Sequence, residues 1–499
     1  MLPTPALSAS VTEFLRERPK KLLIDGQWVA SASGATFTTI NPASGEVIAE
    51  VAEADDVDVD RAVHAARVAF EGPWAKVRPN ERAKLLWRLA DLLEQNIEEL
   101  AQIETIDGGK PVREGLRVDI PMSAEILRYY AGWPTKIFGE TVPISAPGNW
   151  HAYTRREPLG VCGAIIPWNM PIFLTIWKLG PALATGNTVV LKPAEWTPLT
   201  AIRIGELITE AGFPDGVVNI IQGEGATTGA ALVRHPGVDK IAFTGSTATG
   251  QAIMRECAND IKKVSLELGG KSPNIIFADA DLDQAVKGAA NGIFFNNGQT
   301  CIAGSRIFVE EPVYEEVLER LGAWAKQIRL GQPLDAQTQM GPIISERQLN
   351  RVLGYVESGV REGARVVAGA ERAAGDLADG FFIRPTVFAD VQDEMTIARE
   401  EIFGPVAASL SFRDLDEVIA RGNRTGYGLG AGIWTRDISK AHRAANAMQA
   451  GSVWVNCYGL TDAAMPFGGY KQSGIGRELG KQSLDLYTQQ KSVFVNLGH

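Results

Sequence analysis

Cysteine is scarce in this chain of 499 residues, which contains only Cys162, Cys257, Cys301 and Cys457. No two of them form a CxxC pair, so the sequence predicts neither a zinc knuckle nor a thioredoxin-type redox site. So few cysteines in so long a chain indicate a reducing compartment. We therefore expect a cytoplasmic protein without a metal site.

Long apolar runs are also missing. The most apolar window, residues 161–177, is interrupted by Pro167 and Pro171, and it is shorter than the roughly 20 residues that a membrane-spanning helix needs. Residues 1–21 have no apolar core and include acidic side chains, which is typical of neither a signal peptide nor a transit peptide. We expect no membrane partner.

The chain has no excess of basic charge. Its net charge is -10, and no basic run stands out, which argues against nucleic acid or an anionic membrane as the main partner. Hydrophobic residues make up 45% of the chain and charged residues 22%, as in an ordinary soluble globular enzyme. The length is sufficient for two or three domains with a large core.

Strand-like and helical patterns alternate through most of the chain. Residues 1–20 read as a loose leader, short strands follow up to residue 52, and helices are predicted over 57–70, 81–104 (with Asn80 as cap) and 123–130. Strand–helix alternation begins at Val161, and a second alternating region runs from 272 to about 455. Such alternation predicts an α/β fold with a doubly wound parallel sheet. The tail after residue 487 is an isolated strand that needs a partner edge, within the chain or on another subunit.

A loop near the middle of the chain carries Cys301. A helical pattern that starts after Asp281 is interrupted by Asn296-Asn297-Gly298, residues that tolerate a left-handed backbone. Such a loop places a cysteine to react. The alternative is that Cys301 is a small buried hydrophobe, the commoner fate of a free cysteine, and the loop by itself favours that alternative.

Polar or glycine-rich segments follow the strands of the first alternating region, where open α/β sheets bind ligands. Gly245-Ser246-Thr247 opens a helix that could hold a phosphate, although the GxGxxG fingerprint is absent and a serine N-cap has the same appearance. Lys192 and Glu195 suit ribose recognition, with a solvated surface pair as the alternative. We expect these segments to line one crevice.

Two further strand ends carry side chains with catalytic potential. Glu267 lies between Leu266 and Leu268, so it is either a paired structural carboxylate or a general base with a raised pKa. Asn169, held between Trp168 and Met170-Pro171, is either a turn residue or a donor to an oxyanion.

Seven motifs occur in order at these places: PWNMP, KPAEWTP, FTGSTATG, LELGGKS, NNGQTC, EEIFGPV and PFGGYKQSGIGRELG. From about Ile24 to the C-terminus the sequence resembles the NAD(P)-dependent aldehyde dehydrogenase superfamily. The resemblance implies that Cys301 is the nucleophile and Glu267 the general base. It also implies that Asn169 and the Cys301 N–H form the oxyanion hole.

The resemblance further implies a dinucleotide site, in which Glu195 favours NAD over NADP because a carboxylate repels a 2′-phosphate. The implied cofactor-binding residues are Ile166, Pro167, Trp168, Lys192, Glu195, Gly225, Phe243, Gly245, Ser246, Thr249, Gly250, Leu268, Glu401 and Phe403. In the implied reaction a thiolate adds to the aldehyde and hydride leaves for the nicotinamide. Water activated by Glu267 then hydrolyses the thioester to a carboxylic acid.

The implied substrate tunnel is apolar and aromatic, without a cationic side chain. Its residues are Met170, Phe173, Trp177, Phe295, Thr300, Ile302, Leu460, Thr461 and Phe467, although these aromatics, Trp177 in particular, could equally be core. This composition favours an uncharged aromatic or medium-chain aldehyde, in the manner of phenylacetaldehyde dehydrogenases, and disfavours succinate semialdehyde. Aromatic faces also attract quaternary amines, so betaine aldehyde stays open.

The implied organisation has three parts. A dinucleotide-binding domain covers 21–134 and 154–266, with 469–484 returning to it, and a catalytic domain covers 267–468. Residues 135–153 and 485–499 form oligomerisation strands, giving a homotetramer or a dimer. Two rival functions remain: a cysteine hydrolase, which needs a histidine that no motif supplies, and a non-catalytic relative, against which the intact Cys301, Glu267 and Asn169 argue.

Overall fold

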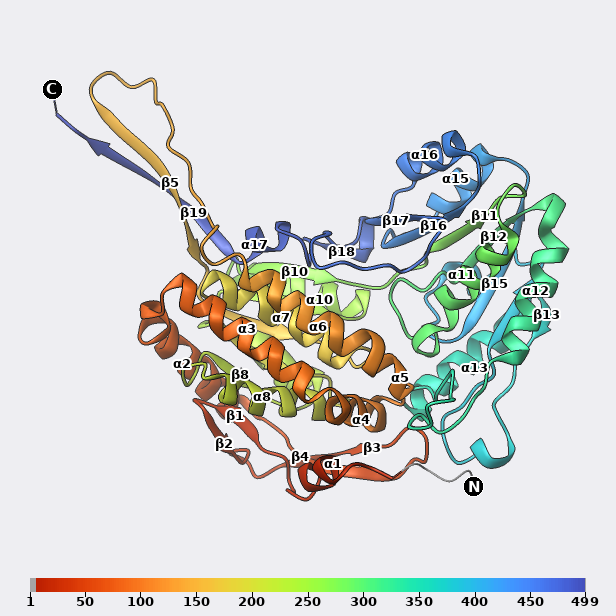
Figure 1. Ribbon diagram of the computed structural model, residues 1–499, viewed down its shortest axis with the longest axis horizontal. Coiled ribbons are helices and arrows are strands. Elements are labelled where there is room, and N and C mark those ends of the chain that lie inside the picture. Colours follow the sequence, from red (N-terminus) through yellow and green to blue (C-terminus); the bar gives the residue numbers. More distant parts are fainter. Residues whose placement is uncertain (1–5, 499) are drawn as a thin grey trace.

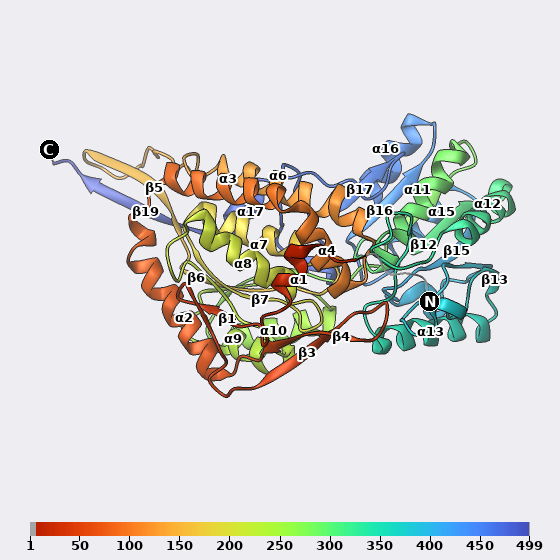
Figure 2. The ribbon, with the colours of Figure 1, turned by 60° about the horizontal axis from the view of Figure 1, so that its bottom comes forward.

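The protein consists of two sheets covered by helices and one projecting β arm, as the computed structural model shows for residues 6–498 (Figures 1 and 2). One sheet has eight strands and the other has seven, and the arm is a separate two-stranded sheet. Within residues 6–498 no helix is long and apolar enough to cross a membrane.

The eight-stranded sheet has the order β18-β10-β9-β6-β7-β8-β1-β2. Its five strands from β10 to β8 are parallel, and β18, β1 and β2 pair antiparallel at the two edges. Parallel strands are buried on both faces, which accounts for their unbroken apolar runs. The bounds are β18 (Gly474–Ile475), β10 (Lys263–Glu267), β9 (Lys240–Thr244), β6 (Val161–Ile165), β7 (Thr188–Lys192), β8 (Val218–Ile220), β1 (Leu22–Ile24) and β2 (Gln27–Val29).

Helices cover both faces of this sheet, so the predicted doubly wound arrangement is confirmed. One face packs against α2 (Asp56–Glu71), α9 (Ala230–Arg234) and α10 (Thr247–Asn259). The other packs against α3 (Pro79–Gln95), α4 (Ile97–Gly108), α6 (Ile120–Ala131), α7 (Pro171–Thr185) and α8 (Leu199–Ala211). A small hairpin, β3 (Thr36–Ile40) with β4 (Val47–Ala52), lies beside this unit.

The second sheet has the order β13-β14-β15-β12-β11-β16-β17, parallel except for β13. Its bounds are β13 (Arg365–Ala368), β14 (Thr386–Ala389), β15 (Val406–Phe412), β12 (Arg306–Glu310), β11 (Pro273–Ile276), β16 (Gly430–Trp434) and β17 (Ser452–Val455). One face packs against α11 (Leu282–Phe294) and α12 (Tyr314–Gln327), the other against α13 (Glu346–Arg361), α15 (Leu415–Asn423) and α16 (Ile438–Ala447). The second α/β region is therefore confirmed.

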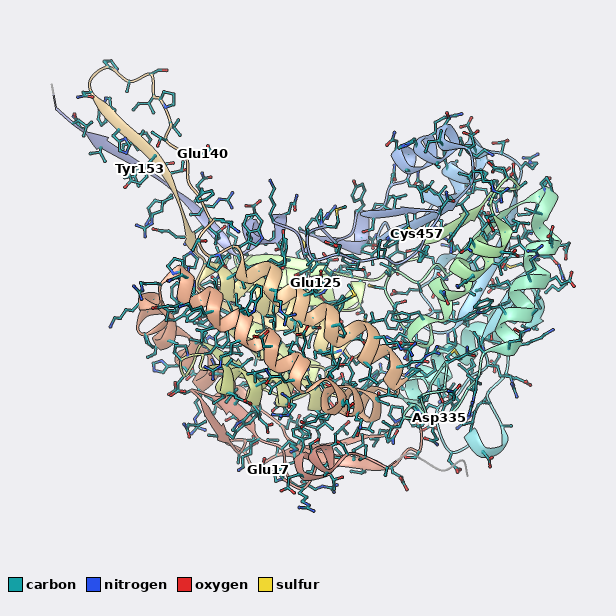
Figure 3. The ribbon with its side chains drawn as sticks, viewed as in Figure 1. Glu17, Glu125, Glu140, Tyr153, Asp335 and Cys457 are labelled. Carbon is teal, nitrogen blue, oxygen red and sulfur yellow. The ribbon has the colours of Figure 1, made fainter. Side chains whose placement is uncertain are left out.

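The C-terminal strand finds its partner within the chain. Strand β19 (Thr488–Asn496) pairs antiparallel with β5 (Trp150–Pro158) along its whole length, from Thr488 opposite Pro158 to Asn496 opposite Trp150. The two strands form an arm that extends away from the helices (Figure 1). Tyr153 lies on this arm, and Glu140 lies on the loop that leads to it (Figure 3).

Two local predictions were wrong. The leader, of which residues 1–5 lie outside the described residues, contains the helix α1 (Ala9–Phe14), which Ser8 caps and which buries Val11 and Phe14. The single helix predicted over 81–104 is two helices, α3 and α4, and Arg78 rather than Asn80 precedes the first. They separate at Asn96, whose side-chain amide donates to the Leu92 carbonyl at 2.8 Å, as asparagine often competes with helical hydrogen bonds.

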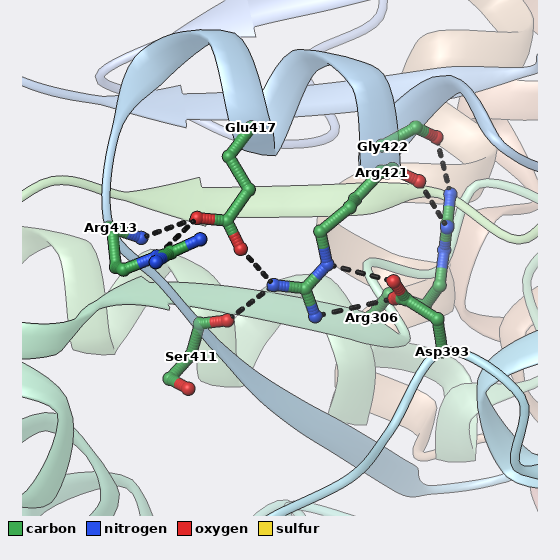
Figure 4. A network of polar contacts seen from close by, with 7 residues as sticks. All are labelled: Arg306, Asp393, Ser411, Arg413, Glu417, Arg421 and Gly422. Atoms are coloured by element: carbon green, nitrogen blue, oxygen red, sulfur yellow. Dashed lines mark hydrogen bonds and ion pairs between the residues drawn. The ribbon is translucent and has the colours of Figure 1, made fainter.

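A polar network joins β12 to α15 (Figure 4), and Arg306 extends it to Lys271, in the segment that connects β10 to β11. The buried guanidinium of Arg306 donates to the carbonyl oxygens of Lys271, Arg421 and Gly422. Arg421 in turn contacts the carboxylates of Asp393 and Glu417. Buried carbonyl groups need such partners, so this network fixes the chain where it passes from one sheet to the other.

We predict that Arg306→Met lowers the free energy of unfolding by about 3 kcal/mol, because buried carbonyl oxygens lose charged donors. Arg413 offers a matched control in the same network, since its side chain is 72% exposed and pairs only at the surface with Glu417. Arg413→Ala should change stability by less than about 1 kcal/mol. Thermal unfolding of both variants measures the difference, and equal midpoints would contradict the prediction.

Candidate active site

A cavity of about 920 Å³ lies where the first sheet meets the loop after α11. Segments that follow β6 and β9 line it, together with the end of β10. The crevice predicted at the strand ends is therefore present, and no histidine lines it among the described residues.

The cavity gathers most of the residues that the sequence singled out. It is lined by Cys301, Glu267 and Asn169, by Pro167, Trp168, Glu195, Gly245, Ser246, Leu268, Glu401 and Phe403, and by Met170, Phe173, Trp177, Phe295, Thr300, Ile302, Thr461 and Phe467. The residues that do not line it are Ile166, Lys192, Gly225, Phe243, Thr249, Gly250 and Leu460. Leu460 is exposed at the surface, and buried Lys192 reaches the cavity only through Glu195, whose carboxylate its Nζ contacts at 3.2 Å.

The segment before Cys301 has an unusual backbone. Helix α11 starts at the Asp281 cap and ends at Phe294, and Asn296, Asn297 and Gly298 then all have positive φ, at 47°, 58° and 71°. The predicted left-handed break is therefore present. Gly298 admits no side chain there, since a Cβ atom would come within 2.3 Å of the Gly404 backbone.

Side-chain hydrogen bonds hold this strained segment in place. The amide of Asn297 donates to the Pro342 carbonyl at 2.7 Å and accepts from the Gly341 N–H at 2.8 Å. Gln299 accepts from the Ile344 N–H at 3.0 Å. Left-handed residues persist where surrounding contacts determine them, so the cysteine that follows has a fixed position.

The same segment is tied to Asn169. The Asn169 Nδ2 donates to the Gln299 carbonyl at 2.9 Å, and the Asn296 Nδ2 donates to the Asn169 carbonyl at 2.8 Å. One amide N–H of Asn169 is thus used for positioning. The amide carries two donors, so the second is available on the side that lines the cavity.

Close backbone approaches shape the wall opposite this loop. A Cβ atom on Gly269 would lie 2.2 Å from the Glu401 carboxylate, and one on Gly270 would lie 2.3 Å from the Cys301 carbonyl oxygen. The Gly270 N–H donates to Glu401 at 3.0 Å. Burial raises the pKa of Glu401 to about 7. The two glycines of LELGGKS are therefore required by space.

Glu267 is a buried carboxyl group with an oxygen that has no partner. Its Oε2 accepts no hydrogen bond within residues 6–498. Burial raises its pKa well above the usual range, the charge of Glu478 raises it further, and Lys178 and Arg477 act in the opposite direction. Lys178 is itself fully buried and paired with Glu478. An acid held in this way exchanges protons nearer to neutral pH than an exposed glutamate does.

The thiol of Cys301 is protonated at neutral pH in this environment. Burial raises its pKa to about 12, and the carboxylates of Glu401 and Glu267 add to the effect, whereas the N–H groups of Cys301 and Ile302 lower it. A thiol must become a thiolate to attack a carbonyl group. The site therefore needs a proton acceptor or an added positive charge before Cys301 reacts.

The other end of the cavity fits a dinucleotide. The Thr244 Oγ1 is buried against this cavity and has no hydrogen-bond partner among residues 6–498. Gly245 and Ser246 directly precede α10 (Thr247–Asn259), with Ser246 as its cap. Helix N-termini favour phosphate. The rings of Trp168 and Phe403 both line the cavity and meet edge to face, with their centroids 5.2 Å apart.

Several lining residues were not predicted. Trp196 directly follows Glu195 in the KPAEWTP motif, which would have indicated it, whereas Tyr458 lies in none of the seven motifs. The cavity as a whole has cationic side chains on its wall, among them Arg347 and Arg351. Two more, Arg113 and Arg117, were outside the predicted tunnel residues. They lie in the short helix α5 (Val112–Glu114) and the π-helical turn η2 (Gly115–Asp119), whose form the local sequence pattern does not indicate.

Comparisons with known proteins agree with this arrangement. The model of the aldehyde dehydrogenase family matches residues 28–493. The chain is 51% identical to the human mitochondrial aldehyde dehydrogenase over 501 residues, covering 98% of this chain and 96% of that protein. The structure of an aldehyde dehydrogenase from Bacillus cereus in complex with NAD+ has a TM-score of 0.97 and 54% identity, covering 99% of this chain and all of that one.

A third relative is the betaine aldehyde dehydrogenase of Staphylococcus aureus in complex with NAD+. It has a TM-score of 0.95 and 42% identity, and the match covers 98% of this chain and 97% of that chain. The motifs of the sequence, the cavity with its cysteine and buried glutamate, and these matches along nearly the whole chain lead to one conclusion. The chain belongs to the aldehyde dehydrogenase family.

Proposed function

We propose that the protein oxidises an aldehyde to the carboxylic acid with NAD and water, with Cys301 as nucleophile. The observation that carries this is the meeting of Cys301, Glu267 and Asn169 at one cavity. The Cys301 thiol gives up its proton to solvent as its sulfur bonds to the carbonyl carbon, and the resulting alkoxide accepts hydrogen bonds from Asn169 and the Cys301 N–H. Loss of hydride from that carbon leaves a thioester on Cys301.

NAD, when bound, accepts this hydride and adds a positive charge near the thiol. The residues that would hold it are Gly245 and Ser246 at the start of α10, Glu195 at the ribose, and Glu401 with Phe403 on the opposite wall. Lys192 orients the Glu195 carboxylate for this purpose. A carboxylate at the ribose favours NAD over NADP.

Glu267 completes the reaction in this proposal. Its unpaired Oε2 accepts a proton from a water molecule, the oxygen of that water bonds to the thioester carbon, and the carbon–sulfur bond breaks to release the acid and the thiol. Because this oxygen has no hydrogen-bond partner among residues 6–498, it is free to take that proton. General-base assistance of this kind contributes about 10²–10⁴ in rate.

The substrate that we propose is an uncharged aromatic or medium-chain aldehyde such as phenylacetaldehyde. Phe173 and Phe467 both pack against Trp177. Their ring centroids lie 4.9 and 5.0 Å, respectively, from the Trp177 ring centroid. Arg113 and Arg117 on the same cavity would repel the quaternary ammonium of betaine aldehyde, which the aromatic faces alone would attract. Betaine aldehyde is thus the second candidate. A cysteine hydrolase would need a histidine beside Cys301, and no histidine among the described residues lines the cavity.

We also propose that the arm joins subunits into a dimer or tetramer, in line with the proposed division into a dinucleotide-binding domain, a catalytic domain and oligomerisation strands. Apolar side chains of the arm and of the segment that precedes it are exposed: Phe494 on β19 is 61% exposed, and Phe138, before β5, is 71% exposed. Exposed apolar patches of this kind mark protein contacts. A two-stranded ribbon is also marginally stable by itself.

We predict that Glu267→Gln keeps the burst of NADH on rapid mixing with NAD and aldehyde but slows steady turnover by about 10²–10⁴. Hydride leaves before water attacks, so only the second stage loses its base. Stopped-flow absorbance measures both stages, with Glu256→Gln, exposed on α10, as control. Loss of the burst in the variant would show that Glu267 also acts on the thiol. If the wild-type protein forms no NADH from NAD and aldehyde, the proposed function is refuted.

For the substrate we predict that kcat/KM for betaine aldehyde is at least about tenfold below that for phenylacetaldehyde, a difference of about 1.4 kcal/mol. Benzaldehyde and hexanal should lie near phenylacetaldehyde. Replacement of Arg113 and Arg117 by Gln should raise kcat/KM for betaine aldehyde selectively. A wild type that prefers betaine aldehyde would show that the aromatic faces, not the guanidinium groups, set the preference.

For the arm we predict that Phe494→Asp yields a smaller species than the wild type, since a charge replaces an apolar contact between subunits. Light scattering coupled to size-exclusion chromatography gives both masses. Lys491→Gln, on the same strand but facing the Glu157 carboxylate of its own chain, should keep the wild-type mass. A monomeric wild type would refute the assignment.

A further inference from the structure

Helix α4 carries a buried glutamate that has no part in the reaction described above. Glu104 is 2% exposed, and its Oε1 accepts a hydrogen bond from the Lys110 ammonium group at 2.9 Å. Lys110 also contacts the carboxylate of Asp119, and both of these side chains are buried. The Lys110–Asp119 pair is balanced in charge by itself. Glu104 is therefore an additional buried carboxylate, which is costly unless it makes further hydrogen bonds.

The second oxygen of Glu104 accepts a hydrogen bond from the start of α7. Its Oε2 accepts the backbone N–H of Ile172 at 3.2 Å. Pro171, the first residue of α7, has no N–H group, and the side chain of Met170 before it makes no capping hydrogen bond. Every residue of α7 is buried, so its first backbone donor needs a partner from the protein. Glu104 supplies this cap from another helix, and a carboxylate is favourable at the positive end of a helix.

The turn directly before this cap carries the oxyanion donor. Asn169 lies in the connection between β6 and α7, three residues before Ile172. Its Nδ2 donates to the Gln299 carbonyl, and its own carbonyl accepts from the Asn296 Nδ2. These bonds fix Asn169 to the loop before Cys301, whereas Glu104 fixes the end of the same turn to α4. The direction of the second amide hydrogen of Asn169 depends on both attachments.

Helix α4 also contacts the segment that holds the loop before Cys301. The helix ends at Gly109, which has a φ of 76°. A Cβ atom on Gly109 would lie 2.8 Å from the Pro342 Cγ, and the Pro342 carbonyl accepts from the Asn297 amide. One helix therefore supports the oxyanion turn through Glu104 and lies against the support of the nucleophile loop through Gly109.

We propose that Glu104 is a positioning residue for the oxyanion donor: by accepting the Ile172 N–H it fixes the turn that directs the free amide hydrogen of Asn169 toward the substrate carbonyl. This rests on the proposed role of Asn169. Glu104 is not among the residues that line the cavity, so it acts through the start of α7. A displacement of about 1 Å at a reacting atom is enough to cost about 10²-fold in rate.

The experiment removes the cap and leaves the ion pair. Glu104→Met has a similar length, is a good helix former and leaves Lys110 paired with Asp119. If this variant does not fold, Glu104→Gln takes its place, because the single oxygen of an amide cannot accept from both Lys110 and Ile172. The matched control is Glu98→Met, which changes an exposed glutamate on the same helix.

Three readouts separate positioning from a general loss of structure. The rate constant of the NADH burst should fall by about 10- to 100-fold in Glu104→Met and keep the wild-type value in Glu98→Met. The dissociation constant for NAD, from tryptophan fluorescence, should stay unchanged in both variants. The rate of Cys301 alkylation by iodoacetamide should also stay unchanged, because this displacement at a saturated carbon forms no oxyanion.

A double-mutant cycle tests whether Glu104 acts through Asn169. Asn169→Ala by itself should slow the burst by about 10²–10³-fold, which is the usual cost of losing an oxyanion donor. In that background Glu104→Met should slow the burst by less than about twofold further, because the donor that it positions is already absent.

Each other outcome overturns the proposal. An unchanged burst in Glu104→Met, or effects of the two substitutions that multiply, shows that Glu104 does not act through Asn169. Weaker NAD binding or slower alkylation in step with the burst indicates general damage to the site. An unchanged burst in Asn169→Ala refutes the role of Asn169 and with it the inference about Glu104. A wild type that forms no NADH refutes the proposed function itself.

Discussion

Three consecutive left-handed residues are the constraint on which the site depends. Each such residue other than glycine costs about 1–3 kcal/mol and persists only where its surroundings determine it. Here Asn296 and Asn297 are fixed by side-chain bonds to Asn169, Gln299, Pro342 and Gly341. Asn169 belongs to the half with the first sheet, and Gly341 and Pro342 belong to the half with the second. The loop before Cys301 therefore joins the two halves at the cysteine.

The electrostatic character of the site follows from that meeting. Bringing the end of β10 against the Cys301 loop buries Glu267 and Glu401 beside a thiol, and all three groups have raised pKa values. A buried carboxyl group avoids charge unless a cation compensates it. Glu267, Glu401 and the Cys301 thiol thus remain uncharged until a positive ligand enters, which protects the thiol from indiscriminate reaction.

The sequence was sufficient for the features that depend on local chemistry. The Asp281 cap, the Asn-Asn-Gly break and the alternation of apolar strands with helices each have a direct physical signature, and all three are present. The family motifs also predicted two site residues from a distant part of the chain, Glu401 and Phe403. Both line the cavity.

The structural features that the sequence did not predict depend on long-range packing. The break at Asn96 comes from a side-chain bond that competes with a continuous helix. Helix α1 is short, and burial of Val11 and Phe14 stabilises it. The cavity side of residues 113–117 depends on a π-helical turn, for which no periodicity exists. Arg113 and Arg117 were therefore missed, and with them a cationic part of the wall.

The pairing of strand β10 with β18 has a consequence for synthesis. Glu267 ends a strand whose outer partner is Gly474–Ile475, and Glu478 raises its pKa from the same late segment. During translation the nucleophile loop and the cofactor end emerge long before these residues. The segment with Gly474–Ile475 and Glu478 must therefore be made before Glu267 has the surroundings that raise its pKa.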